Sequence, residues 1–323
     1  MQLVIDMPGL GHVNCYALED GEGFALIDPG LPGPESWNNL TVRLAAAGIP
    51  LARIHTVIVT HSHPDHFGGA SQLRAETGAR IVSDRRFAVR WVRDDDGDDR
   101  DIEDRFEDID IETIWNERKA PWGGTSPAPP PDRMRQMMEM DHSPVRMRPT
   151  ERLDDADVIS LARREWVALH TPGHTGDCLC LFDPEYGVMF SGDHVLPTIT
   201  PHIGDTRGPA DPLKEFFDSL DKVAAYGSRT NIVLPAHGDV FTDIAGRAEA
   251  IKRHHVERLG VLREASHALG RPASVMEMST HLFSQRAQGP MADSETYAHL
   301  EHLRLLGEAD VVEVDGILQY VVH

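Results

Sequence analysis

The residues with the clearest chemical potential are three histidines and one aspartate packed into six positions: His61, His63, Asp65 and His66. In an extended backbone, side chains at positions i and i+2 point to the same side, so His61 and His63 can converge on one ion. Pro64 favours this geometry, because the residue before a proline is pushed toward extended conformations. Asp65 and His66 follow that bend and can face a second position. The segment therefore predicts a metal-binding site.

Three further candidate ligands each stand next to a glycine, which lets the backbone approach an ion closely. They are His174 within HTPGHTGD, Asp193 within FSGDH and His237 within LPAHGD. Together with the first segment they supply five imidazoles and two carboxylates, a set suited to two metal ions about 3.5–4 Å apart. Because no cysteine is among these candidates, we expect two divalent ions with zinc favoured, while iron and manganese stay open.

A histidine alone is weak evidence for a metal, because the chain contains 18 of them. We interpret the histidines of the C-terminal part as surface or satisfied core residues: His254, His255, His267, His299 and His302. The cluster that begins at His61 is different, since burying it without a metal would leave several polar groups unpaired.

The elements that must position these ligands alternate between strands and helices over the first 90 residues. Short apolar runs predict strands over 3–7, 14–20, 23–30, 56–60 and 80–84, and the pattern between them predicts helices over Glu35–Ala47 and Ala70–Thr77. Strand patterns return over 165–170, 178–183, 188–193 and 231–239. This alternation is typical of an α/β fold.

The last 80 residues have a different pattern, with predicted helices over Ala245–Leu269 and Tyr297–Leu306. Two short strands around an Asp-Gly turn follow them, as in a hairpin. We therefore expect a catalytic domain over residues 1–240 and a small winged-helix-like α+β domain over residues 245–323.

Residues 94–150 form a predicted insertion of unusual composition. Twelve acidic residues lie between Asp94 and Glu112, and five of the eleven methionines follow: Met134, Met137, Met138, Met140 and Met147. One interpretation is a surface excursion with an amphipathic helix. We favour a lid that lays adaptable apolar side chains over a pocket, because long insertions in compact domains usually serve a function.

Composition excludes several classes of protein. With 31 basic and 52 acidic side chains the formal charge is −21, which argues against a nucleic-acid partner. No apolar run is long enough to span a membrane, and the N-terminus lacks the features of a signal peptide. Three cysteines without a secretory signal are typical of a reduced, cytoplasmic protein. The sequence is compatible with a homodimer.

The motif THSHPDHFGG, the later TPGHT, the GD pair and His237 resemble the metallo-β-lactamase fold superfamily in order and spacing. The resemblance covers about residues 1–240. It implies an α/β fold of four layers, an αββα sandwich, with the site at one edge of two packed sheets. It also implies that Asp28, in the segment LIDPG, supports the site from behind the ligands.

The resemblance further implies which residues hold each ion. The first ion is expected to be bound by His61, His63 and His174. The second is expected to be bound by Asp65, His66 and His237, with Asp193 bridging both.

A bridging carboxylate at Asp193 argues against a true β-lactamase, since those enzymes generally lack it. The run DHVLPTITPHIG and the C-terminal part resemble the lactamase-β-2-like branch, which includes thioesterases and a ribonuclease. We therefore expect a dinuclear metal-dependent hydrolase of an ester-like bond: a thioester, lactone or carboxylic ester of a small, apolar acyl substrate.

In the expected mechanism, a metal-bridging hydroxide attacks the carbonyl while the ions stabilise the oxyanion. Asp65 is a candidate for carrying the proton to the leaving group, and His194 or His202 for an additional oxyanion donor. Two alternatives stay open: a phosphodiesterase or ribonuclease that uses the same two ions, and an oxidoreductase like the persulfide dioxygenases, which use a single iron.

Overall fold

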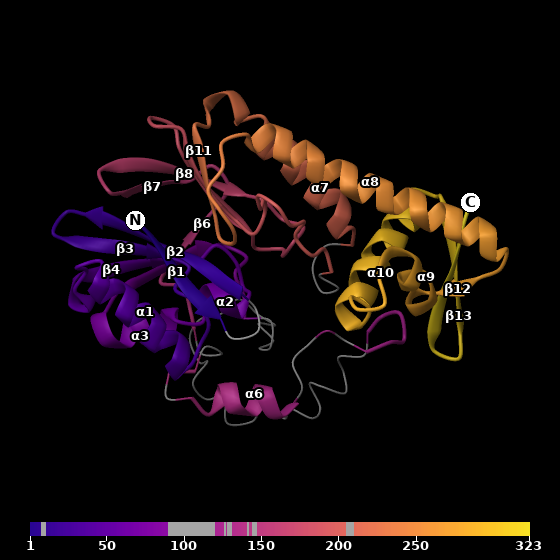
Figure 1. The fold of residues 1–323 in the computed structure, drawn as a ribbon, viewed down its shortest axis with the longest axis horizontal. Coiled ribbons are helices and arrows are strands. Elements are labelled where there is room, and N and C mark those ends of the chain that lie inside the picture. The colour runs from indigo at the N-terminus through magenta and orange to yellow at the C-terminus, as the bar shows by residue number, and fades with distance from the viewer. Residues whose placement is uncertain are drawn as a thin grey trace.

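The computed structural model describes residues 1–7, 11–89, 120–125, 127, 131–140, 142–143, 147–204 and 210–323 (Figure 1). The acidic run between Asp94 and Glu112 lies outside the described residues. None of the described helices is both long and apolar enough to cross a bilayer.

The N-terminal part is built around a six-stranded sheet whose strands stand in sequence order. These strands are β1 (Gln2–Met7), β2 (Gly11–Asp20), β3 (Gly23–Ile27), β4 (Ile54–Ile58), β5 (Arg80–Asp84) and β6 (Glu151–Leu153). The first three pair antiparallel, and β3 to β6 pair parallel. The parallel strands are joined by crossovers that contain α1 (Pro34–Ala46), α2 (Pro64–Phe67) and α3 (Ala70–Thr77).

A second sheet of five strands follows, in the order β11-β10-β9-β8-β7. Its strands are β7 (Val158–Leu161), β8 (Arg164–His170), β9 (Leu179–Asp183), β10 (Val188–Gly192) and β11 (Ile232–Pro235). They pair antiparallel except for β10 and β11, whose parallel pairing is made possible by the crossover helix α7 (Pro212–Ala224).

Three apolar clusters hold these elements in four layers. The cluster between the sheets contains Ile58 from the first sheet and Trp166 and Phe190 from the second. The outer face of the first sheet packs against Leu40 of α1 and other apolar residues of α1 and α3. The outer face of the second sheet is covered by α7 and α8 (Ile244–Leu269), as Figure 1 shows. The fold is therefore α/β, with helices outside two packed sheets.

The C-terminal part adds helices and a small antiparallel sheet beyond the sandwich. Its further elements are β12 (Ala273–Ser274), α9 (Val275–Leu282), α10 (Pro290–Leu305), β13 (Ala309–Val314) and β14 (Ile317–Val322), with the sheet order β12-β14-β13. Asp243 caps the start of α8 by accepting a hydrogen bond from the Gly246 amide, and left-handed Gly270 ends the helix.

Most predicted elements are present, with two differences in the C-terminal part. The structure contains α9, which no apolar periodicity predicted. The helix predicted over Tyr297–Leu306 begins seven residues earlier, at Pro290. Its first turns bury small residues such as Ala292 and Ser294 instead of large apolar ones. Such a helix has no apolar stripe that a sequence pattern can detect.

The described part of the predicted insertion touches both ends of the molecule. Trp122 is fully buried in the cluster that includes the C-terminal elements, and its carbonyl accepts a hydrogen bond from the Leu318 amide. Farther along the chain, Met147 packs in the cluster under the first sheet, and Met137 of α6 (Pro131–Met138) is also buried. The described residues between 120 and 150 thus contact both the C-terminal elements and the first sheet.

Two fully buried histidines tie α8 to α10. His255 Nδ1 lies 3.0 Å from His299 Nε2, and His299 Nδ1 donates to the Glu295 carbonyl at 2.7 Å. Burial lowers the pKa of His255 to about 2 and that of His299 to about 3. Burial also raises the pKa of the neighbouring Glu295 to about 7, although Arg258 opposes that shift.

We predict that these histidines make the protein less stable in acid. Both are neutral when folded, but the unfolded chain binds protons at them below about pH 6.5, so the free energy of unfolding falls as pH drops toward 3. At pH 5 the loss is up to about 2 kcal/mol per histidine, and Glu295 offsets part of it. Urea unfolding between pH 7 and 4 should therefore give a flatter profile for a His255→Leu/His299→Leu variant.

Exposed His267, also on α8, provides the control. The His267→Asn variant should follow the wild-type pH profile. A double variant with the wild-type slope would contradict the assignment of neutral buried imidazoles.

Candidate metal centre

The seven predicted ligands lie at one edge of the sandwich. His61 and His63 follow β4, Asp65 and His66 begin α2, and the remaining three follow β8, β10 and β11. Pairing makes β8, β10 and β11 run in the same direction, so their carboxyl ends meet at one edge. Ligands distant in sequence converge there because loops at strand ends carry them.

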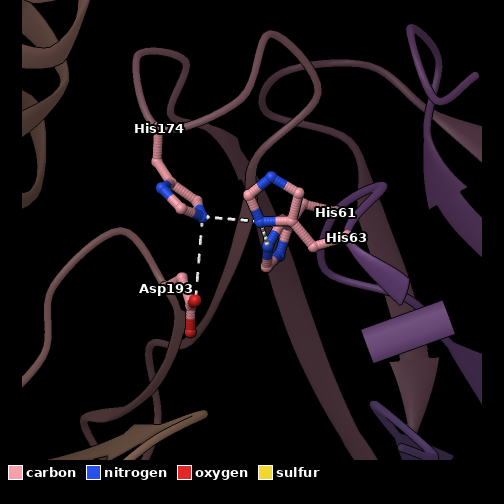
Figure 2. A group of neighbouring side chains, drawn as sticks. All are labelled: His61, His63, His174 and Asp193. Atoms are coloured by element: carbon pink, nitrogen blue, oxygen red, sulfur yellow. Dashed lines mark hydrogen bonds and ion pairs between the residues drawn. The ribbon is translucent and has the colours of Figure 1, made fainter. Parts of the chain in front are cut away.

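The first group of donors contains three imidazoles and a carboxylate (Figure 2). His63 Nδ1 lies 3.1 Å from His61 Nε2 and 3.0 Å from His174 Nε2. His174 Nε2 lies 3.6 Å from the Asp193 Oδ2. His61 is fully buried and Asp193 is 8% exposed, so both side chains are largely shielded from solvent.

The second group contains Asp65, His66 and His237. Asp65 Oδ2 lies 3.6 Å from His66 Nε2 and 3.5 Å from His237 Nε2. Asp193 faces this group as well, at 3.5 Å from His66 Nε2 and 3.4 Å from His237 Nε2. The carboxylate of Asp193 therefore stands between the two groups.

Backbone carbonyls fix the orientation of two of these rings. His174 Nδ1 donates to the His202 carbonyl at 2.7 Å, and His237 Nδ1 donates to the His12 carbonyl at 2.6 Å. A carbonyl only accepts, so each Nδ1 carries the hydrogen, and in the neutral ring each Nε2 presents a lone pair to the centre. Asn14 of β2 adds support by donating to the carbonyls of Pro235 and Gly238, on either side of His237.

Asp28 fixes two further rings, those of His66 and His61. Its Oδ2 accepts from His66 Nδ1 at 2.9 Å and from the Thr60 hydroxyl at 2.7 Å. Because that hydroxyl donates to Asp28, its oxygen is free to accept from His61 Nδ1, 3.1 Å away. Asp28 itself has a φ of 54°, a left-handed conformation that is costly outside glycine. Its position supports the role expected from the sequence.

The donor set fits a metal at both groups. The lone pairs of His61 and His174 converge on His63 Nδ1, and one hydrogen on that atom could satisfy only one of them. Within the described structure, His66 Nε2 and Asp193 Oδ1 are buried and have no hydrogen-bond partner. Buried polar groups without partners are costly, and a divalent cation would satisfy these atoms together.

The electrostatics of the two groups differ. Burial and the neighbouring histidines hold the pKa of His61 well below its ordinary value. Burial also disfavours a charge on His66, but Asp65 and Asp193 outweigh it and hold the pKa of His66 well above its ordinary value. His237 follows the same balance, with a pKa raised to about 10. The neighbouring carboxylates thus favour protonated rings at His66 and His237, whereas burial favours the neutral ring of His61.

The remaining predicted residues, His194 and His202, contact α7 and α10. His194 is fully buried with its ring against Phe216 of α7, and burial lowers its pKa to about 3. His202 Nε2 lies 3.0 Å from both the Met291 carbonyl and the Ser294 hydroxyl, on α10. An oxyanion-donor role for either ring stays a prediction.

Several supporting residues escaped sequence reasoning, among them Thr60, Asn14 and Ser294. The backbone carbonyls of His12 and His202 leave no signal in a sequence, because every residue has one. Asp28 was found only because its LIDPG context matched a known pattern.

A two-sheet α/β sandwich with a His/Asp cluster at its edge is typical of metal-dependent hydrolases. Comparisons with known proteins agree with this class. The model of the metallo-beta-lactamase superfamily matches residues 8–237. The chain belongs to that superfamily.

Several known proteins are similar to this chain. The acyl-coenzyme A thioesterase MBLAC2 of Gallus gallus is 26% identical over 291 residues, 85% of this chain and 88% of that protein. An atrochrysone carboxyl ACP thioesterase of Aspergillus fumigatus is 27% identical over 74% of this chain and 55% of its own length. The metallo-beta-lactamase family protein TTHA1429 of Thermus thermophilus has a TM-score of 0.79 at 27% identity, covering 100% of this chain and 98% of that one.

We predict that Asp28→Asn weakens metal binding by about 10–100-fold, the usual effect of losing a group that orients a metal ligand. The Asp28 carboxylate accepts three hydrogen bonds, from His66 Nδ1, the Thr60 hydroxyl and the Thr60 amide. The oxygen of an amide side chain can accept only two, so His66 and His61 lose their fixed orientation. Competition with a chromogenic chelator measures the affinities.

Asp183→Asn is the matched control, because Asp183 is equally buried but ends β9 and pairs with Arg164. Equal metal affinities for the two variants would show that Asp28 does not orient the ligands.

Proposed function

We propose that this protein is a dinuclear metal-dependent hydrolase of ester-like bonds, and that acyl thioesters are its best-supported substrates. The observation that carries the proposal is the position of Asp193, whose carboxylate lies 3.4–3.6 Å from histidines of both donor groups. A shared carboxylate is what two neighbouring ions need, since it offers one oxygen to each.

In this proposal His61, His63 and His174 hold the first ion. Asp65, His66 and His237 hold the second, and Asp193 bridges the two. Nitrogen and oxygen donors without sulfur favour zinc and also suit iron or manganese.

When bound, two such ions would activate a water molecule and polarise the substrate carbonyl. The protein's own contribution is to orient the imidazoles through the Asp28 carboxylate and the carbonyls of His12 and His202. Asp65 has a side chain that is 22% exposed, against 11% for Asp193. It is thus the more accessible carboxylate, and we assign it the transfer of a proton to the leaving group.

An apolar acyl group fits the surroundings of the site. Ile199, on the loop from Asp193 to His202, is 58% exposed, and Val240, three residues after His237, is 43% exposed. Met140 lies next to the loop after β3. Its methyl group is 3.7 Å from the position that a Cβ atom would occupy at Gly33. Ile199 and Val240 support an apolar substrate, and the contact of Met140 supports a lid role for the predicted insertion 94–150. The thioesterase names of two relatives point to the same bond type.

We also propose the domain organisation expected from the sequence, residues 1–240 and 245–323. The order of α8, β12, α9, α10 and the β13-β14 hairpin supports a winged-helix-like second domain. We also propose that the protein belongs to the lactamase-β-2-like branch, which its sequence resembles. Three buried, unpaired cysteines fit a cytoplasmic protein, and a homodimer is compatible with the proposal.

We predict about two metal ions per chain in protein purified without added metal. His61→Ala should lose at least one ion, because it removes a nitrogen donor from the first group, and Asp193→Ala should weaken both. Elemental analysis by mass spectrometry gives the ratio and the metal.

His55→Ala is the control, since His55 lies on β4 but bonds to Thr56 and Asp20 at the far end of the strand. It should keep both ions. One iron per chain would instead favour oxygen chemistry, and a thiol–persulfide assay would follow.

We predict metal-dependent turnover of acyl-CoA thioesters, tested beside lactones, carboxylic esters and single-stranded RNA. Removing a bridging ligand in Asp193→Ala should abolish that turnover, whereas His55→Ala should retain it. Cleavage of RNA alone, lost in Asp193→Ala, would replace the ester proposal by the ribonuclease alternative. No turnover of any ester by the metal-loaded protein would refute the proposal.

A further inference from the structure

We propose that the first turn of α10 positions the metal ligand His174 through His202, so that the C-terminal helices form part of the metal centre. His202 is then a positioning residue. This inference rests on the proposed function, because it concerns the ion that His174 would bind.

The first link is between two loops of the sandwich. His174 belongs to the loop after β8, and His202 lies 28 residues later, on the loop that follows β10 and Asp193. The 2.7 Å hydrogen bond from His174 Nδ1 to the His202 carbonyl sets the direction of the His174 ring. The ring can face the first ion only as long as that carbonyl stays in place.

The second link fixes that carbonyl from α10. His202 Nε2 lies 3.0 Å from the Met291 carbonyl, which only accepts, so Nε2 carries the hydrogen. The same nitrogen lies 3.0 Å from the hydroxyl of Ser294, which is fully buried and donates to the Met291 carbonyl at 2.9 Å. A side chain on Gly204 would begin 2.2 Å from the His202 ring, so only glycine leaves room for the ring there.

A separate contact ties α10 to the other side of the His174 loop. His302 Nδ1 lies 2.9 Å from the carboxylate of Asp211, which caps the start of α7. Phe216 of α7 packs against Gly173. A Cβ atom at Gly173 would lie 2.4 Å from the Cβ of Phe216, so only glycine fits there. The Ser219 hydroxyl of α7 donates to the Pro172 carbonyl at 2.9 Å.

His174 of the first group therefore depends on a different part of the chain from the ligands of the second group. His174 is oriented by elements attached to α10. In the second group, His66 is oriented by Asp28 after β3 and His237 by the His12 carbonyl in β2. Loosening the first turn of α10 should weaken the first ion and leave the second nearly unchanged.

The experiment compares Ser294→Ala with Thr296→Ala. Both remove a hydroxyl from a fully buried side chain of α10, but that of Thr296 bonds only to the Ala292 carbonyl, one turn earlier. Chelator competition with zinc resolves the affinities of the two ions. We expect about tenfold weaker binding of one ion in Ser294→Ala and wild-type values in Thr296→Ala.

A second pair of variants guards against general loss of folding. His202→Leu removes the ring hydrogen bonds and should weaken the same ion, whereas His202→Gln keeps an N–H donor and should recover part of the affinity. The visible absorption of Co²⁺ in the first site should change in Ser294→Ala and His202→Leu, while circular dichroism of all four metal-free variants stays native.

The outcomes separate this inference from the proposed function. A wild-type chain that binds no metal would refute the proposed function. If the wild type binds two ions and Ser294→Ala and His202→Leu bind both with unchanged affinity, only the positioning role of α10 fails. Equal weakening of both ions, or equal effects of Ser294→Ala and Thr296→Ala, would also overturn it.

Discussion

Imidazole lone pairs repel one another when they converge in a buried space, and this constraint governs the edge of the sandwich. Ring nitrogens of His61 and His174 each lie about 3 Å from His63 Nδ1, and the Asp193 carboxylate lies 3.6 Å from His174 Nε2. Such a group is stable only when a positive charge stands among the donors. In the second group, protonated His66 and His237 can supply that charge; in the first group a metal ion is the natural partner.

The hydrogen bonds behind the ligands follow from the same constraint. A ring presents its Nε2 lone pair inward only if its Nδ1 hydrogen has an acceptor outside the centre. The acceptors here come from different places: the Asp28 carboxylate, the Thr60 hydroxyl, and the carbonyls of His12 and His202. Two packed sheets make this possible, because the ends of their strands bring such groups to one edge and the rigid sheets hold them there.

The C-terminal helices extend this framework beyond the sandwich. One helix, α10, contacts His202, Asp211 and His255, and its Tyr297 packs against Trp122 of the predicted insertion at a ring distance of 5.1 Å. This helix therefore connects the loops of the two-sheet sandwich with Trp122 of the predicted insertion. Small and polar residues serve this role well, because they fill tight contacts and satisfy one another's hydrogen bonds.

By itself, the sequence determined the alternation of strands and helices, the HxHxDH segment and the identity of the seven candidate ligands, since these depend on local spacing and on chemically distinctive side chains. It could not reveal α9, the early start of α10 or the direction in which His194 and His202 point. Those features depend on contacts between distant residues, above all backbone carbonyls and small buried side chains. Such contacts have no local pattern, and only the packing of the complete chain decides them.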